Sequence, residues 1–273
     1  MINLLKTDLI RVFKDKLFLV LGIIGVAFAL VTPITSRIML FVLELDPSDV
    51  AEIVPMTAKS MFFSSFSLSN NFGLIVPILV TIILCKDFSH GTIRNKIICG
   101  NRRWQIFLSL FISGTVAMFA AILAHALLTL GVSVLLFKYQ AEPFTASDLG
   151  YFLLSVLFEA IVYAYVASIT AFLCAWAKNS GVAIVCFIAI LLISTIVGNI
   201  STMALMLIFP EENETAYNVW NFLSRINIFV NAQIGNGRSY STEDVLYILL
   251  PPLCFGAITV LSGLFIFNKK DLK

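Results

Sequence analysis

Five basic side chains and one acid lie within about twenty residues of this sequence, between two long apolar stretches. The segment runs from Cys85 to Trp104 and reads CKDFSHGTIRNKIICGNRRW. Its charged residues are Lys86, Asp87, Arg94, Lys96, Arg102 and Arg103. Such a cluster can bind acidic groups on another protein. It can also simply fix the orientation of a membrane protein, because Lys and Arg accumulate on the side that is not translocated.

The order of residues within this segment favours a structured element over a plain loop. Asp87 follows an apolar stretch, Gly91 and Thr92 interrupt the pattern, and residues 92–98 then have the spacing of a short amphipathic helix. Gly91 allows the backbone to turn before this helix. Thr92 or His90 is expected to cap the helix.

An acid, the pattern G-T-x-R, a short helix, and a glycine followed by a basic pair resemble the coupling loop of ABC type-2 exporter permeases. In that family the loop contacts a separate subunit that hydrolyses ATP. The residues to which the resemblance assigns this contact are Asp87, Gly91, Thr92, Ile93, Arg94, Lys96, Ile97 and Arg103. We expect Ile93, Ile97 and Ile98 to fill an apolar groove on that subunit. Arg94 and Lys96 would then meet carboxylates around the groove.

The resemblance also implies the other components of the assembly. ATP and Mg²⁺ are expected on the ATPase subunit, with no cofactor bound by this chain, which would not itself be an enzyme. A second copy of the permease, or a similar chain, would complete the membrane part. The substrate would be amphipathic: an antimicrobial or other peptide, a drug or a lipid. We expect contacts with lipid and none with nucleic acid.

Two ionisable side chains, His125 and Glu159, fall inside predicted spans, where such groups by default face protein or water. Each lies on a stripe of mostly small or polar residues spaced four apart, which favours close helix packing. The stripes are Ser113, Ala117, Ala121, His125, Thr129 and Ser133, and Ser155, Glu159, Tyr163, Ala167, Ala171 and Ala175. Two interpretations stay open: ordinary interior packing, or a place with Tyr163 in a transport path. We predict that His125 and Glu159 are close neighbours.

Motifs for several other chemistries are absent from the sequence. No G-x-x-x-x-G-K-[ST] occurs, so the chain cannot hold ATP in a P-loop. H-E-x-x-H and G-x-S-x-G are also missing. The five cysteines are odd in number and none lies at metal-ligand spacing, so we expect neither a disulfide framework nor a metal site.

The amino-acid composition is that of a membrane protein. Hydrophobic residues make up 59% of the 273 residues and charged residues 12%, with a mean hydropathy of +0.97. Soluble domains carry about a quarter of their residues as charged groups. Continuous apolar runs of twenty or more residues predict an all-α, polytopic membrane protein. They exclude a membrane β-barrel, whose strands alternate.

The pattern predicts one transmembrane domain over residues 1–273, with six spans. They are expected at about 17–43, 61 or 72 to 85, 104–137, 149–177, 181–209 and 245–267. Residues 1–16 place Ile2, Leu5, Leu9, Val12 and Phe13 at helical spacing, which predicts an amphipathic helix in the membrane interface. The apolar residues within 210–244 predict a further interfacial or re-entrant helix.

The distribution of charge predicts the orientation. The N-terminus, the 86–103 loop, the 178–180 turn and the C-terminal tail carry 13 of the 18 basic residues and four of the 16 acids. The positive-inside rule places this side in the cytoplasm, with both termini, and 210–244 outside. We therefore expect a multi-pass protein of the cell membrane. The alternative function is a non-transport membrane protein: an assembly or sensor subunit, or an intramembrane enzyme.

Overall fold

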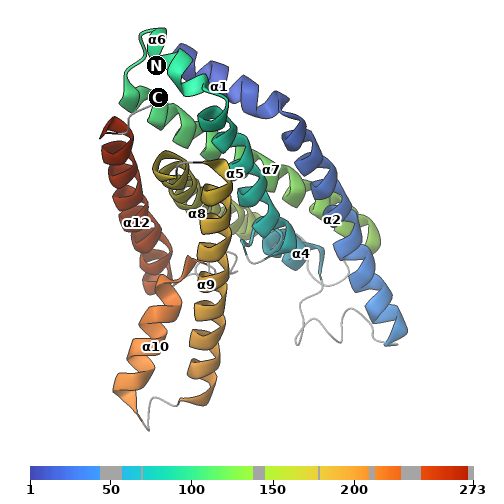
Figure 1. The fold of residues 1–273 in the computed structure, drawn as a ribbon. Helices are drawn as coiled ribbons and strands as arrows, with labels where there is room; N and C mark the ends of the chain where they lie inside the picture. The colour runs from blue at the N-terminus through green and yellow to red at the C-terminus, as the bar shows by residue number, and fades with distance from the viewer. Residues whose placement is uncertain are drawn as a thin grey trace.

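The computed structural model describes residues 1–43, 57–68, 70–137, 145–177, 179–208, 213–228 and 241–269. Within these ranges the regular elements are all α-helices, which confirms the predicted class. Six are long and apolar enough to cross a membrane: α2 (Lys16–Val42), α5 (Asn71–Ser89), α7 (Arg103–Phe137), α8 (Ala146–Trp176), α9 (Ser180–Leu207) and α12 (Thr242–Lys269). The chain is therefore built as a multi-pass membrane protein (Figure 1).

Four shorter helices accompany the six long ones: α1 (Ile2–Lys14), α4 (Ala58–Ser64), α6 (Thr92–Ile98) and α10 (Glu214–Ile226). The predicted N-terminal helix and the predicted helix at 92–98 are thereby confirmed as helices. Most of the predicted exterior loop at 44–60, much of the loop at 138–148, residues 229–240 of the 210–244 segment and the tail from residue 270 lie outside the described residues.

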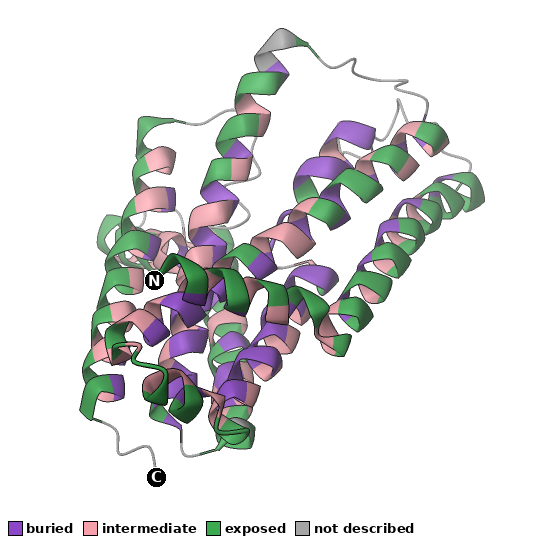
Figure 2. Cartoon of the chain, turned by 90° about the horizontal axis from the view of Figure 1, so that it is seen from above, coloured by how far each residue is buried: buried purple, intermediate pink, exposed green. Residues whose placement is uncertain are grey.

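Three of the long helices form the interior and three lie around it. In the most apolar stretch of α5, α7 and α8, 56%, 50% and 50% of the residues are buried, against 22% in α2, 22% in α9 and 11% in α12. Figure 2 shows the exposed residues following the outward faces of the peripheral helices. Because these faces are rich in Leu, Ile and Val, they are suited to lipid or to another membrane-spanning chain.

Helix α7 is the longest element and contacts α1, α2, α4, α5, α8 and α12. Its 35 residues span about 52 Å at 1.5 Å per residue, whereas a bilayer has a hydrocarbon core of about 30 Å. The helix therefore extends beyond the apolar layer, and its first turns reach the level of α1 and α6. The two predicted stripes on α7 and α8 are buried, with Ala121 only partly so, which confirms that they pack against protein.

The start of the second span, ambiguous in the sequence, is settled by α4 and α5. The N-cap of helix α4 is Thr57, and the side chains of Thr57 and Ser60 cap each other's backbone N–H groups. The polar residues that follow form a turn, and the span itself starts at Asn71. The backbone of this turn lies so close to Gly73 that a Cβ atom there would overlap the carbonyl of Ser67. Glycine is therefore required where the turn folds back onto α5.

Helix α10 confirms the helix predicted in the 210–244 segment. It lies beside the second half of α9 (Figure 1). Just after its last turn, the Asn227 side chain donates a hydrogen bond to the Ser194 carbonyl, with a nitrogen–oxygen distance of 2.8 Å. Since Ser194 lies midway along α9, the end of α10 reaches back to the middle of a membrane-spanning helix.

The first residues of the chain, α6 and the last turns of α12 gather at one end of the molecule (Figure 1). The Phe267 ring packs against Phe88 of α5 and Phe107 of α7, with centroids 6.0 and 6.1 Å apart. The basic segment 86–103 thus lies beside both terminal helices. This grouping agrees with the predicted topology, in which all three belong to one side of the membrane.

Candidate functional site

A buried charge network lies under α6, where α6 meets α1 and the end of α5. The ammonium group of Lys96 on α6 donates to Asp8 on α1 at 2.6 Å and to Asp87 on α5 at 2.9 Å. Both carboxylates are fully buried, and the Lys96 side chain is 10% exposed. One lysine therefore joins segments of the chain that are 88 residues apart.

Two further side chains complete this network. Arg11 of α1 forms an ion pair with Asp87, and the Ser109 hydroxyl of α7 donates to Asp8 at 2.6 Å. Buried charges are tolerated only when they are paired and hydrogen-bonded, because their removal from water costs several kcal/mol per ion. The network ties α1, α5, α6 and α7 together, and it acts as a specific connection between them rather than as a nonspecific apolar contact.

A second ion pair lies at the junction between α1 and α2. Lys86 donates to both carboxylate oxygens of Asp15 at 2.8 and 2.7 Å, and Asp15 also accepts from the backbone N–H of Leu17. Burial alone would raise the pKa of Asp15, but these hydrogen bonds outweigh it and leave the pKa below its ordinary value. Burial lowers the pKa of Lys96 and of Arg11, and their carboxylate neighbours oppose that shift.

Helix α6 has an inner and an outer face. Ile93 is 2% exposed and belongs to the chain's own core, and Ile97 packs partly against that core. Arg94 and Ile98 face outward, with Ile98 74% exposed. The core holds Ile93 and the charge network holds Lys96, and their predicted contact with a partner stays a prediction. The surface that α6 offers to a partner consists of Arg94, Asn95, Ile98 and their neighbours.

The turn before α6 depends on Gly91, whose backbone has φ of +67° in the left-handed region. Residues with a side chain rarely adopt this conformation, so the predicted turn at Gly91 is confirmed. The predicted side-chain cap from Thr92 or His90 is wrong, because Gly91 itself occupies the capping position and no side chain hydrogen-bonds there.

Arg103, the last residue assigned to the coupling loop, is directed to the end of α12. Its guanidinium donates to the backbone carbonyls of Phe267 and Asn268, at 3.5 and 2.9 Å. The carbonyls in the last turn of a helix lack partners within the helix and carry partial negative charge, which a cation stabilises. The basic segment is thus connected to α12 as well as to α1 and α5.

His125, Glu159 and Tyr163 are all buried, as predicted. His125 lies between α2 and α5: its Nδ1 is 3.0 Å from the Gly25 carbonyl and its ring is 4.4 Å from that of Phe72. Because a carbonyl only accepts, Nδ1 carries the proton. Glu159 and Tyr163 are fully buried on α8. The pairing of His125 with Glu159 stays a prediction.

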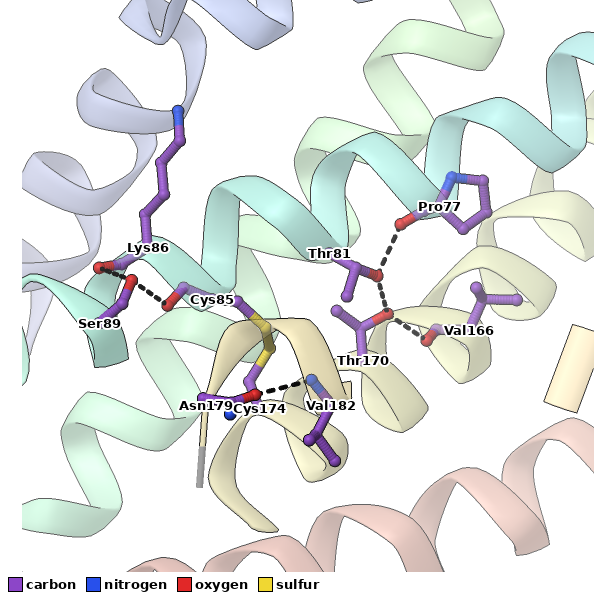
Figure 3. Close-up of a disulfide and its surroundings, with 10 residues drawn as sticks. All are labelled: Pro77, Thr81, Cys85, Lys86, Ser89, Val166, Thr170, Cys174, Asn179 and Val182. Atoms are coloured by element: carbon purple, nitrogen blue, oxygen red, sulfur yellow. Dashed lines mark hydrogen bonds between the residues drawn. A yellow bond between two sulfur atoms is a disulfide. The ribbon is translucent and has the colours of Figure 1, made fainter. Parts of the chain in front are cut away.

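Cys85 and Cys174 form a disulfide between α5 and α8, with Cα atoms 5.5 Å apart (Figure 3). This corrects the expectation that no cysteine is cross-linked. Near it, the hydroxyls of Thr81 and Thr170 are hydrogen-bonded at 3.2 Å. Lys86 is the next residue along α5 but points away from the disulfide (Figure 3). Its ammonium group donates to Asp15. The sequence carried a signal for this pairing, since both cysteines lie near the ends of spans that finish on the same side.

Within the described residues, no three His, Cys, Asp or Glu side chains are grouped so that they could hold a metal ion. No family model matches the chain, and no curated protein matches it either. The functional argument therefore rests on the geometry of the chain itself.

Proposed function

We propose that this chain is the membrane-spanning permease subunit of an ATP-driven exporter of the ABC type-2 kind. The observation that carries the proposal is the placement of α6. Helix α6 lies at the end of the molecule where α1 and the last turns of α12 also lie (Figure 1). A buried charge network holds its inner face, and its outer face presents Arg94 and Ile98. An exposed apolar side chain beside a cation suits a protein contact with an apolar centre and a charged rim.

The connections of this segment suit the transmission of force. A displacement of α6 acts directly on α1 and α5 through Lys96, and Arg103 joins the same segment to α12. Each connection is a specific hydrogen-bonded contact, so movement of α6 requires movement of the helices bound to it. A loop that served only to fix topology would need none of these connections.

The proposal includes the remainder of the assembly. ATP and Mg²⁺ bind to a separate ATPase subunit on the cytoplasmic side, where both termini and α6 lie. A second permease copy or a similar chain contacts one of the apolar outer faces of α2, α9 or α12, and lipid covers the others. The substrate is amphipathic and crosses the cell membrane outward.

A purification through a tag on this chain tests the proposal. Membranes from the source cells are dissolved in mild detergent, and the captured complex is illuminated with a photoreactive ATP analogue. A labelled subunit should accompany the wild-type chain and should be largely lost from the double variant Arg94→Glu, Ile98→Asp. The control variant Arg37→Glu changes an exposed charge near the C-terminal end of α2. The complex captured through this variant should retain the labelled subunit.

Two results would contradict the proposal. One is the absence of any ATP-labelled subunit with the intact chain. The other is equal retention in the double variant and the control. The first would favour a non-transport membrane protein, and the second would remove the coupling role of α6.

A further inference from the structure

A groove of about 580 Å³ lies between α10 and the first half of α12. This half of α12 is remote from α6 (Figure 1). The volume of the groove falls in the range of about 300–1,000 Å³ that is usual for small-molecule sites. Two helices of one chain form both walls, so the groove exists without a partner. It does not involve the charge network or the surface of α6.

The walls of the groove are apolar and unusually aromatic. Phe222 comes from α10, and Tyr247 and Phe255 come from α12; aliphatic side chains such as Ile226 and Leu250 fill the space between them. Aromatic rings carry negative charge on their faces and attract organic cations, most strongly where water is excluded. The walls therefore suit a ligand that is both apolar and positively charged.

Among the described residues that line the groove, Glu243 is the one that carries a charge. Its side chain is 79% exposed, and its carboxylate lies 3.8 Å from the Arg225 guanidinium. Arg225 has other contacts: it donates to Asn221 at 3.0 Å, lies 3.6 Å from Asp244, and stacks over one face of the Tyr247 ring at 5.0 Å from its centroid, which leaves Phe222 and Phe255 as the open aromatic faces. Among the described residues, the rim thus carries two carboxylates against one guanidinium, and the Glu243 carboxylate is accessible.

Pro251 interrupts the regular hydrogen bonding of α12 in the same wall. Proline has no N–H, so the carbonyl of Tyr247 cannot accept the usual hydrogen bond from the residue four positions later. Tyr247 and Pro251 both line the groove. This stretch of α12 therefore lacks one of the regular hydrogen bonds of the helix.

We propose that the groove between α10 and α12 binds a hydrophobic organic cation. Its aromatic or aliphatic body lies against Phe222, Tyr247 and Phe255, and its charge lies beside Glu243. An anionic amphiphile of the same shape is disfavoured by the two carboxylates of the rim. The inference concerns binding to this chain alone, so it stands independently of whether an ATPase drives the protein.

The test uses the purified chain in phosphatidylcholine nanodiscs and the probe tetraphenylphosphonium, measured by equilibrium dialysis against protein-free discs. We expect one saturable site per chain. Tetraphenylborate, which has the same shape and the opposite charge, should show none. Glu243→Gln should weaken binding on the order of five- to tenfold, as one charge pair near a protein surface allows. Arg225 retains Asp244 in that variant. Glu214→Gln, at the other end of α10, is the charge control.

A second variant tests the volume of the groove. Leu250→Trp should fill it and abolish the saturable component. Leu261→Trp, which enlarges another exposed residue of α12 outside the groove, should leave it unchanged. Unaltered binding in both Glu243→Gln and Leu250→Trp would overturn the proposal. So would saturable binding of tetraphenylborate with equal affinity, or no saturable binding of either ion to the intact chain.

Discussion

Replacing Asp8 by alanine is the sharpest perturbation of the charge network. Its carboxylate is fully buried and accepts from Lys96 and Ser109 at 2.6 Å each. Removing one partner of a buried ion pair typically costs about 3–5 kcal/mol, because the other charge stays buried. Since Lys96 keeps Asp87 at 2.9 Å, we expect the lower end of that range, about 3 kcal/mol. The measurement is the free energy of unfolding in mixed micelles, by SDS titration followed by circular dichroism.

A control variant and a double variant test whether the loss of stability comes from a buried charge that is left without its partner. Asp15→Ala removes the partner of Lys86, whose side chain is 34% exposed, and the cap at the start of α2, and should cost about 1–2 kcal/mol. Lys96→Met should cost about as much as Asp8→Ala, since it leaves buried carboxylates. Combining Asp8→Leu with Lys96→Met should cost less than either single change, because Asp87, the buried carboxylate of the network that remains, keeps its ion pair with Arg11. The reasoning is refuted if Asp8→Ala costs no more than Asp15→Ala, or if the effects of the pair simply add.

Three further predictions concern orientation, cross-linking and pH. The exposed thiol of Cys99 should react with an impermeant maleimide only after permeabilisation, and a cysteine at Glu214 should react from outside; the reverse would invert the topology. Peptides from protein purified without reductant should contain the Cys85–Cys174 link, and its reduction should lower the free energy of unfolding by about 2–4 kcal/mol; alkylation of both Cys85 and Cys174 in that protein would contradict the pairing. Because the folded pKa of Asp15 lies below 3.8, its ion pair stabilises the protein above that pH and is lost as the pH falls through the folded value. The stability difference between wild type and Asp15→Asn should therefore be constant from about pH 7 to pH 5 and shrink below about pH 4, whereas a loss already near pH 6 would exclude this carboxylate as the cause.

The membrane-spanning helices could be predicted because the length of an apolar run is a local property. The expected third span at 104–137 is α7, Arg103–Phe137, and the expected fourth at 149–177 matches α8 closely. The last turns of α12 and the basic segment also lie at one end, as the alternation of six spans requires. For these features no contact between distant residues had to be known.

The packing face of α1 could not be predicted in the same way. The apolar stripe that includes Ile2 and Phe13 was expected to face the membrane, and both residues are exposed. The buried stripe is Leu4, Asp8 and Val12, in which an acid occupies the middle position. Asp8 is buried because Lys96, far along the chain, satisfies its charge, and sequence spacing does not reveal such a partner.

Helix α6 shows the same limit on a smaller scale. Its existence follows from the glycine turn and the spacing of its isoleucines. Its orientation does not, because a seven-residue helix with Ile93, Ile97 and Ile98 has apolar side chains on more than one face. Burial of Ile93 and the bonds of Lys96 fix the orientation and leave Ile98 outside.

Cys99 offers the most direct test of the central claim that α6 contacts an ATP-hydrolysing subunit. It is an exposed native thiol directly after Ile98. A variant without Cys186 and Cys254 is labelled at Cys99 with a benzophenone maleimide in permeabilised source cells and then illuminated. We predict a cross-linked product that also incorporates a photoreactive ATP analogue, and no such product when the only free cysteine is placed at Glu214. Complete labelling of Cys99 without cross-linking to an ATP-binding protein would contradict the account.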